Sequence, residues 1–412
     1  VVTKPTDSGP GSLREALQTT GSGTTITFDP VLDGQTIALS SGPLVLDKSV
    51  TIDASGLADG ITISGGGAQR VFSVADGETV TLRALTIAEG SASSGAGLTN
   101  RGNLTLDGVT VTGNATTGNL GTGGGVRNRV GATLTLRNST LSGNAAPGGD
   151  GNGGGIYNDG TVVLISSTLF GNSAGASGGG ILNLGTLTLQ SSVIAGSAGG
   201  DCVGGSVTES RSLVEDGSCG ATLSGDPLLE ALANNGGPAA THRPDAFSPL
   251  VDAGACNGLS ADQRGQQRPV ETNARPTAVD GCDIGAVELG ASELPFRRYV
   301  DAEATGAGDG SSWTDAFNDL QDALAEADDN DQIWIAAGTY TPTEGTDRTV
   351  SFRVTGAQDG LRIYGGFAGT ETRLDQRDLS ASETVLSGGI GTPGDVSDNS
   401  YHVFVFDGTT GG

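Results

Sequence analysis

Aromatic side chains, methionine, histidine and basic residues are all scarce in this sequence. Aromatic residues make up 4% of the 412 residues, Met is absent and only two His occur. A thick core built around large rings is therefore excluded, and imidazole can contribute little to a metal site. The 21 basic residues stand against 47 acidic ones, which gives a net charge of -26. Such a surface repels nucleic acid and anionic membrane faces, so neither is expected as a partner.

Long apolar runs are missing as well. No stretch of about 18 apolar residues occurs, so we expect no membrane insertion. The chain starts at Val1 with neither Met nor a signal peptide, and we expect its N-terminus to come from processing or truncation. Glycine, in contrast, is abundant, with 71 residues. It follows no strict Gly-X-Y period, which excludes collagen and leaves a thin, repetitive core as the best reading.

The chain has four cysteines, and their spacing bears on both structure and compartment. Four cysteines allow three disulfide connectivities, and proximity in the sequence favours two of the pairs. Neither pair has CxxC spacing, so a zinc site is not expected. Disulfides indicate an oxidising compartment. The favoured pairs are Cys202–Cys219 and Cys256–Cys282.

A unit of about 24–30 residues recurs between residues 80 and 200. Each copy alternates aliphatic and small residues over a few positions, with Gly, Asn or Asp between these runs. Period-2 alternation predicts strands, and Gly or Asn at fixed offsets predicts turns with positive φ. Three short parallel strands per unit describe one coil of a β-helix, and coils stack about 4.8 Å apart. The strand portions are Val80–Leu82, Leu104–Leu106, Leu134–Leu136, Val162–Leu164 and Leu187–Leu189.

Stacking of such coils predicts two ladders of inward side chains. The first is aliphatic, and the second is made of amides that hydrogen-bond from one coil to the next. No coil can bury its own inner face, so stability must come from its neighbours. The aliphatic ladder holds Leu106, Leu136, Leu164 and Leu189, and the amide ladder holds Asn128, Asn158 and Asn183.

The sequence also predicts where β-helices begin. Ser12–Glu15 fits a helix capping box, and Leu13, Ala16 and Leu17 give a short amphipathic helix that would cover the first coil before a strand at 26–28. A similar start recurs near residue 298, with a helix expected from Trp313 through Leu324 and strands at 332–336 and 361–364.

We therefore expect an all-β fold. Residues 1–290 would form a right-handed parallel β-helix whose closing segment, about 200–290, is tied by disulfides. Residues 291–297 would be a linker, and 298–412 an incomplete second β-helix.

Several motifs resemble those of known bacterial surface proteins. The run Gly11-Ser12-Leu13-Arg14-Glu15-Ala16-Leu17 looks like the N-terminal cap motif of CSLREA-type β-helix proteins, with Gly11 where some members have Cys. The Gly-Gly-Gly-Ile-x-Asn and Ser-Gly-Asn repeats resemble those of polymorphic outer-membrane proteins. Residues 226–288 are similar to the closing region of choice-of-anchor Q proteins, and 298–406 look like the opening of a second pectin-lyase-like β-helix. This resemblance implies secretion and display on a bacterial cell surface, without fixing a ligand.

Enzymes with this fold need clustered carboxylates and a base on one face. In the repeats, Glu89, Asp107, Asp150 and Asp159 fall at different positions of their coils, and Arg127 and Arg137 have no evident carboxylate partner. We therefore expect no catalytic residues, although a polysaccharide lyase or carbohydrate-binding module stays open as an alternative. The densest polar set is expected to brace turns through Arg264, and His242 is expected to pack rather than act as a base. That set is Asp226, Asp252, Asp262, Arg264 and Asp283.

Metal and sugar attachment give only weak signals. Asp328, Asp329 and Asp331 are the candidates for calcium, but they lack the Gly and distal Glu of an EF-hand loop and are expected to end a helix. No cofactor is otherwise expected. Asn103, Asn114 and Asn138 lie in N-x-Ser/Thr sequons that the Asn/Thr-rich composition itself produces.

The sequence as a whole favours an extracellular structural or adhesive protein, a stalk or adhesin segment with a glycan or cell-surface ligand. An alternative is a subunit of a head-to-tail filament. Such a homopolymer would join through β-helix ends, because an open edge at Val403, Phe404, Val405 and Phe406 could contact another copy and propagate.

Overall fold

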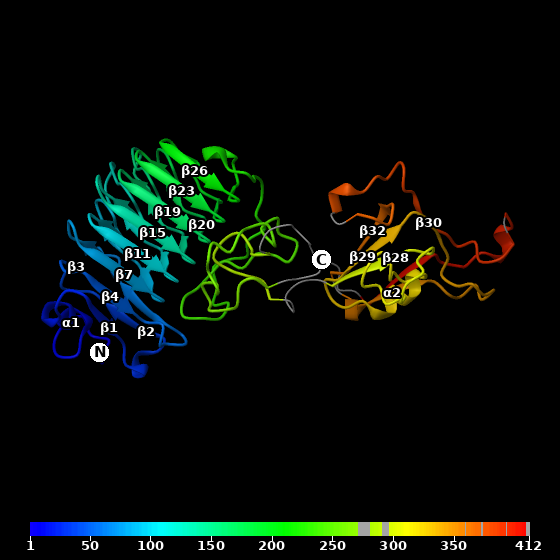
Figure 1. The fold of residues 1–412 in the computed structure, drawn as a ribbon, viewed down its shortest axis with the longest axis horizontal. Helices are drawn as coiled ribbons and strands as arrows, with labels where there is room; N and C mark the ends of the chain where they lie inside the picture. Colours follow the sequence, from blue (N-terminus) through cyan, green and yellow to red (C-terminus); the bar gives the residue numbers. More distant parts are fainter. Residues whose placement is uncertain (271–280, 291–295, 359, 372–373, 393, 409–412) are drawn as a thin grey trace. The chain divides into compact units, whose positions relative to one another are not determined.

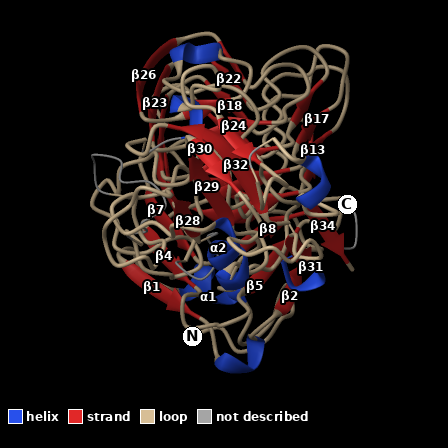
Figure 2. Ribbon diagram, turned by 90° about the vertical axis from the view of Figure 1, so that its right-hand side faces the viewer, coloured by secondary structure: helices blue, strands red, loops and turns tan. Residues whose placement is uncertain are grey.

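The computed structural model describes residues 1–270, 281–290 and 296–408, except 359, 372–373 and 393. The described chain divides into two compact units (Figure 1). The first holds residues 1–270 and 281–290, and the second holds the described residues from 296 onward. The expected linker, 291–297, lies for the most part outside the described residues. Strands, red in Figure 2, make up most of the regular structure.

The first unit is a right-handed parallel β-solenoid. Its chain winds through three long parallel sheets, and each sheet receives one strand per turn, or rung. The first sheet contains β1 (Thr24–Thr27), β4 (Val50–Asp53), β7 (Thr79–Arg83), β11 (Asn103–Asp107), β15 (Thr133–Arg137), β19 (Thr161–Ile165), β23 (Thr186–Gln190) and β26 (Ser206–Ser210). The second contains β2 (Gln35–Ala38), β5 (Ile61–Ser64), β8 (Thr86–Ala88), β12 (Thr110–Thr112), β16 (Thr140–Ser142), β20 (Thr168–Phe170), β24 (Val193–Ala195) and β27 (Leu213–Val214).

The third sheet completes each rung. It contains β3 (Leu44–Leu46), β6 (Phe72–Val74), β10 (Leu98–Asn100), β14 (Val126–Asn128), β18 (Ile156–Asn158), β22 (Ile181–Asn183) and β25 (Cys202–Val203). The expectation of three strands per rung is incomplete, because a fourth, short sheet lies between the second and third in the middle rungs. Its strands are β9 (Ser91–Ala92), β13 (Ala115–Thr116), β17 (Ala145–Ala146) and β21 (Ser173–Ala174). These two-residue strands carry mostly Ala and Ser, so no alternation of large and small residues marks them in the sequence.

Aliphatic side chains line up inside the stack because the rungs pair without slippage. Leu106, Leu136, Leu164 and Leu189 are Cα partners on successive first-sheet strands, and all four are fully buried. Side chains alternate between the two faces of a strand, so the residues directly before and after each of these leucines face outward. Burial of each Leu contributes roughly 1.5–3 kcal/mol of transfer free energy. The core is therefore one continuous column rather than a set of separate clusters.

Polar ladders occupy the corners between sheets. Asn100, Asn128, Asn158 and Asn183 are fully buried, and each amide nitrogen donates to the next amide oxygen at 2.8, 2.8 and 2.7 Å. A second ladder, Asn114–Asn144–Asn172, repeats this at 2.9 and 3.0 Å. At the third corner the hydroxyls of Ser139, Ser167, Ser192 and Ser212 accept backbone N–H groups from the preceding rung. In each of these ladders the buried side chains thus find hydrogen-bond partners on the neighbouring rung.

Both ends of the solenoid are covered. At one end, α1 (Leu13–Thr19) buries Leu13 and Leu17 against the core. Ser12 Oγ accepts from the Glu15 amide at 3.1 Å, and Arg14 pairs with Asp7 at 2.6 Å. At the other end, the Cys202–Cys219 disulfide and a 3-10 turn (η2, Ser218–Gly220) fold over the last rung, with Cys219 and Ala221 packed on the core. Edge strands that would otherwise invite pairing are closed.

The second unit also pairs its strands in parallel. β28 (Arg297–Val300), β29 (Gln332–Ala336) and β32 (Arg362–Phe367) form one sheet. β30 (Gly338–Tyr340) pairs with β33 (Thr384–Leu386), and β31 (Phe352–Thr355) pairs with β34 (Phe404–Asp407). Helix α2 (Leu320–Glu326) covers β28, β29 and β31. Short 3-10 turns lie in this unit at η4 (Gly356–Gln358), η5 (Leu374–Gln376) and η6 (Val396–Asp398), and in the first unit at η1 (Pro30–Leu32).

The helix of this unit is shorter than the sequence predicts. The expectation of a helix from Trp313 is wrong, because Asp319 caps the helix by accepting from the Gln321 amide at 2.8 Å. Phe317 instead bonds to the carbonyl of Tyr299 through its own amide. Trp313 packs on the Tyr299 ring at 4.7 Å and donates to the Glu371 carbonyl.

Candidate functional site

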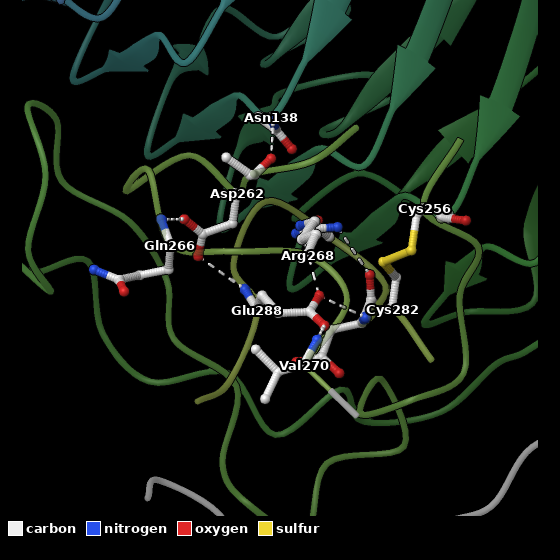
Figure 3. Close-up of polar contacts among 12 residues, drawn as sticks. Asn138, Cys256, Asp262, Gln266, Arg268, Val270, Cys282 and Glu288 are labelled. Atoms are coloured by element: carbon white, nitrogen blue, oxygen red, sulfur yellow. Dashed lines mark hydrogen bonds and ion pairs between the residues drawn. A yellow bond between two sulfur atoms is a disulfide. The ribbon is translucent and has the colours of Figure 1, made fainter. Parts of the chain in front are cut away.

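The described parts of the closing segment, residues 226–270 and 281–290, lie along the outer face of the second sheet and carry the densest buried charge among the described residues (Figures 1 and 3). Threonines of that sheet hold it in place: Thr110 Oγ1 donates to the Ala240 carbonyl, Thr140 Oγ1 to Gln263, and Thr168 Oγ1 accepts from the Ala286 amide. Leu250 and Ile284 pack on Val193 and Leu213 beneath them. The outer face of these rungs is therefore occupied by the chain itself.

Two disulfides hold the segment and the solenoid end before it. Cys202 bonds to Cys219, and Cys256 bonds to Cys282. The favoured connectivity from the sequence is confirmed. None of the described cysteines is free.

Four of the five polar residues singled out in the sequence come together here. Asp252, Asp262, Arg264 and Asp283 are buried, whereas Asp226 is exposed and accepts from the Leu228 amide of its own turn. Arg264 pairs with Asp262 at 2.9 Å, and the Asp252 amide donates to Asp283. These carboxylates brace turns rather than face solvent.

Arg268 and Glu288 complete the cluster, and sequence reasoning missed both. Arg268 lies 3.5 Å from the Glu288 carboxylate and donates to the carbonyls of Asp283 and Gly285 (Figure 3). Glu288 accepts from the amides of Asp283 and Val270. The usable signal was the lone acid between Val287 and Leu289, since a charge inside an aliphatic run predicts a buried partner.

Burial controls the titration of this cluster. Burial, with the neighbouring Glu288 carboxylate, raises the pKa of Asp283 to about 8. Burial likewise raises the pKa of Glu288 and lowers the pKa of Arg268, although each partner works against these shifts. A shifted carboxyl can mark a catalytic acid. Asp283 is 2% exposed and its carboxylate accepts from two backbone amides, so the chemistry it supports is structural.

His242 is also part of this contact. It is buried, packs against the Phe170 ring at 4.7 Å in a tilted arrangement, and its ring nitrogens bond to Ser142 Oγ and the Glu230 carbonyl. Burial lowers its pKa, which favours the neutral ring. The ring therefore packs the closing segment onto the sheet.

The calcium candidates lie beside α2 without forming a ligand set. Asp331 is buried, accepts from the amides of Phe296 and Asp328, and lies 3.4 Å from Arg298. Within the described part of the chain, no three His, Cys, Asp or Glu side chains gather as metal ligands.

No helix that the structure describes has the length and apolar character needed to cross a bilayer.

The edge proposed for self-association lies in the second unit. Phe404, Val405 and Phe406 belong to β34, which pairs with β31, and Val403 precedes it. Val403 and Phe404 pack partly on the core of that unit, while Phe406 is 69% exposed.

Of the sequons, Asn114 is fully buried in an amide ladder and Asn103 is exposed.

One expectation about charge is wrong. Arg127 was expected to lack a carboxylate partner, yet it pairs with Asp159 of the next rung at 2.5 Å and lies over the Tyr157 ring at 3.8 Å. Arg127 and Tyr157 are Cα partners on adjacent strands, and Asp159 follows Tyr157 by two positions. The sequence alone does not show this register between the two strands, so it does not show that Asp159 lies beside Arg127.

Around this pair lies a cluster that we call the arginine surface: Arg70, Arg101, Arg127 and Arg129, with Asp76, Val130, Tyr157 and Asp159. Five of these residues, Asp76, Arg101, Arg129, Val130 and Asp159, line an open hollow of about 350 Å³. Arg70 donates to the carbonyls of Ser94 and Gly95, and its burial and the charges of Arg101 and Arg129 lower its pKa. Sequence reasoning did not assign these arginines to one surface.

The fold and these surfaces define a capped parallel β-solenoid with a laterally docked closing segment. No family model, no curated protein and no solved structure matches the chain. Its function must be inferred from its own residues.

Proposed function

We propose that the chain is a rigid structural and adhesive segment of an extracellular bacterial protein. The observation that supports this most is the unbroken column of stacked rungs, covered at both ends and braced along one side. A solenoid resists bending because each rung is held by its neighbours through sheet hydrogen bonds and side-chain ladders. Two disulfides fit an oxidising compartment.

An enzyme of the lyase type is less well supported. The second-sheet face of the solenoid is covered by the closing segment, and the carboxyls with raised pKa, Asp283 and Glu288, are buried inside that segment rather than in a groove. The open hollow on the other side is lined by two arginines and two aspartates, with Arg127 engaging one of them.

Electron microscopy of the purified protein and a lyase assay test this proposal together. We expect short rods whose length matches eight stacked rungs, about 40 Å for the first unit. Incubation with uronic-acid polysaccharides should give no absorbance from unsaturated products. Flexible, irregular particles, or product formation that grows with enzyme concentration, would contradict the proposal.

A second candidate is a head-to-tail filament through the second unit. It is favoured by the apolar exposure of Phe406 and by β34 having, among the described strands, a partner on one side only. Sedimentation at increasing concentration tests it. Association that Phe406→Ser abolishes supports the filament, and a single monomeric boundary at all concentrations rejects it.

A further inference from the structure

The charges on the first and third sheets are arranged in opposite ways. On the outer face of the first sheet, Asp53, Arg83 and Asp107 follow one another on successive strands and form ion pairs. Just beyond the third sheet, Arg101 and Arg129 occupy the same position of consecutive rungs, since the Arg129 amide donates to the Asn100 carbonyl. Like charges on neighbouring strands are destabilising. The stability of the fold therefore does not explain why Arg101 and Arg129 occupy the same position of consecutive rungs.

Both of these arginine side chains are exposed. Across the part of the chain that the structure describes, neither forms an ion pair or a side-chain hydrogen bond. The two free guanidiniums thus belong to backbone positions about one rung, or ~4.8 Å, apart. They lie beside the same open hollow, in a chain whose net charge is -26.

A buried group nearby is also incompletely bonded. Arg127 is 9% exposed and uses one nitrogen for Asp159, but its Nε and Nη1 have no hydrogen-bond partner among the described residues. The buried Thr99 hydroxyl, on the adjacent strand, likewise lacks one. These atoms are sealed from solvent, and the Arg127 guanidinium lies over the Tyr157 ring at 3.8 Å, so Arg127 forms the base of the surface while the exposed Arg101 and Arg129 are left to meet a ligand.

We propose that the arginine surface binds an acidic polysaccharide, with Arg101 and Arg129 each holding one carboxylate or sulfate group along the glycan. Guanidinium forks recognise such planar or tetrahedral oxyanions through paired hydrogen bonds. The repeat of one rung is close to the length of one sugar unit. Val130, which is 81% exposed, supplies an apolar contact for a sugar face beside them.

Other polyanions fit less well. The four arginines and two aspartates leave a local excess of two positive charges, from four minus two. A nucleic acid duplex carries one negative charge per roughly 1.7 Å and would meet the acidic remainder of the surface over a long stretch. A glycan with one charge per sugar matches the small excess. The hollow is open, which suits a chain passing across it better than a small enclosed anion.

This inference rests on the adhesive role proposed above, and binding measurements test it separately. The full chain is titrated with dextran sulfate, polygalacturonate, neutral dextran and duplex DNA at low salt, with a chelator present so that calcium cannot bridge acidic groups. We expect binding to one or both charged polymers, weakened by salt. Comparing the affinities for dextran sulfate and polygalacturonate shows whether the surface prefers sulfate or carboxylate groups.

The decisive variant is Arg101→Ala with Arg129→Ala. Both side chains are exposed, so the fold should be retained, and binding should weaken by about tenfold or more. The matched control, Arg83→Ala with Arg137→Ala, removes the same charge from the first sheet and should bind like the parent.

Equal loss in the control, equal binding of neutral dextran, or tighter binding of duplex DNA would overturn the inference. Each can occur while the protein remains an inert rod, so failure here is distinct from failure of the adhesive role. Product formation in the lyase assay would instead remove the role on which the inference rests.

Discussion

The rungs of residues 80–200 and the closing segment of residues 226–290 bury polar groups in opposite ways. The rungs use neutral amides and hydroxyls, each repeated at one position and each bonded to its copy above and below. The closing segment uses charges that occur once, such as Arg268 with Glu288 and Arg264 with Asp262. In the rungs, many equivalent hydrogen bonds therefore satisfy the buried polar groups. In the closing segment, each buried charge depends on one particular partner of opposite charge.

The largest effect is expected from breaking the buried charge cluster. Arg268→Met leaves the Glu288 carboxylate buried without its cation, and should lower the free energy of unfolding by about 3–5 kcal/mol. Urea unfolding of the full chain measures it. Arg243→Met, whose ion pair with Glu230 is partly exposed, is the control and should lose less than about 1 kcal/mol. Equal losses would contradict the claim that the closing segment depends on its buried charges rather than on its partly exposed ones.

The disulfide Cys256–Cys282 should rank next. It closes 26 residues, so replacing both cysteines by Ser should destabilise by roughly 3 kcal/mol. The loss should fall on the closing segment, since the rungs contain neither cysteine. Limited proteolysis checks this: new cleavage within 226–270 is expected, and new cleavage within 80–200 would argue that the segment holds the rungs together.

A single rung of the amide ladder should matter somewhat less. Asn128 accepts from Asn100 and donates to Asn158 and Thr161, so Asn128→Ala leaves buried groups unpaired and should lose about 2 kcal/mol. The control is Asn103→Ala, an exposed position of the same repeat, which should change stability by less than about 0.5 kcal/mol. Thermal unfolding compares the pair, and a neutral Asn128→Ala would show that amide stacking is dispensable.

A dependence of stability on pH, confined to the closing segment, is also expected. Asp283 keeps its proton in the folded state up to about pH 8, while its ordinary pKa is 3.8. Unfolding releases that proton at intermediate pH, so the contribution of Asp283 is present in full below its ordinary pKa. It is lost progressively as pH rises toward about 8. Asp283→Asn should flatten the profile of thermal midpoint against pH, and an unchanged slope would contradict the assignment.

The repeated part of the fold could be predicted because its signals add up from one copy to the next. Alternation places Leu106, Leu136, Leu164 and Leu189 on one face, and spacing places Asn128, Asn158 and Asn183 at one corner. The structure has both sets in register. The cap helix and the disulfide pairs follow from local signals of the same kind, a capping box and short separations.

The remainder depended on contacts that no local pattern encodes. Gln263 meets Thr110 and Thr140 across more than a hundred residues, so the docking of the closing segment could not be seen in the sequence. The partnership of Arg127 with Asp159 required the register of β14 with β18. The register of β10 with β14 places Arg101 and Arg129 on adjacent rungs, which is why the arginine surface emerged only from the structure.

Hydrogen exchange of backbone amides along residues 80–200 tests the central claim most directly. If neighbouring rungs hold one another through aligned Leu and Asn side chains, the backbone amides of β7, β11, β15, β19 and β23 that bond to adjacent strands should exchange slowly and with one common opening free energy. Asn128→Ala should then speed exchange in all of these rungs together. Acceleration limited to β14 and β15, or rungs that open independently in the parent, would contradict the account.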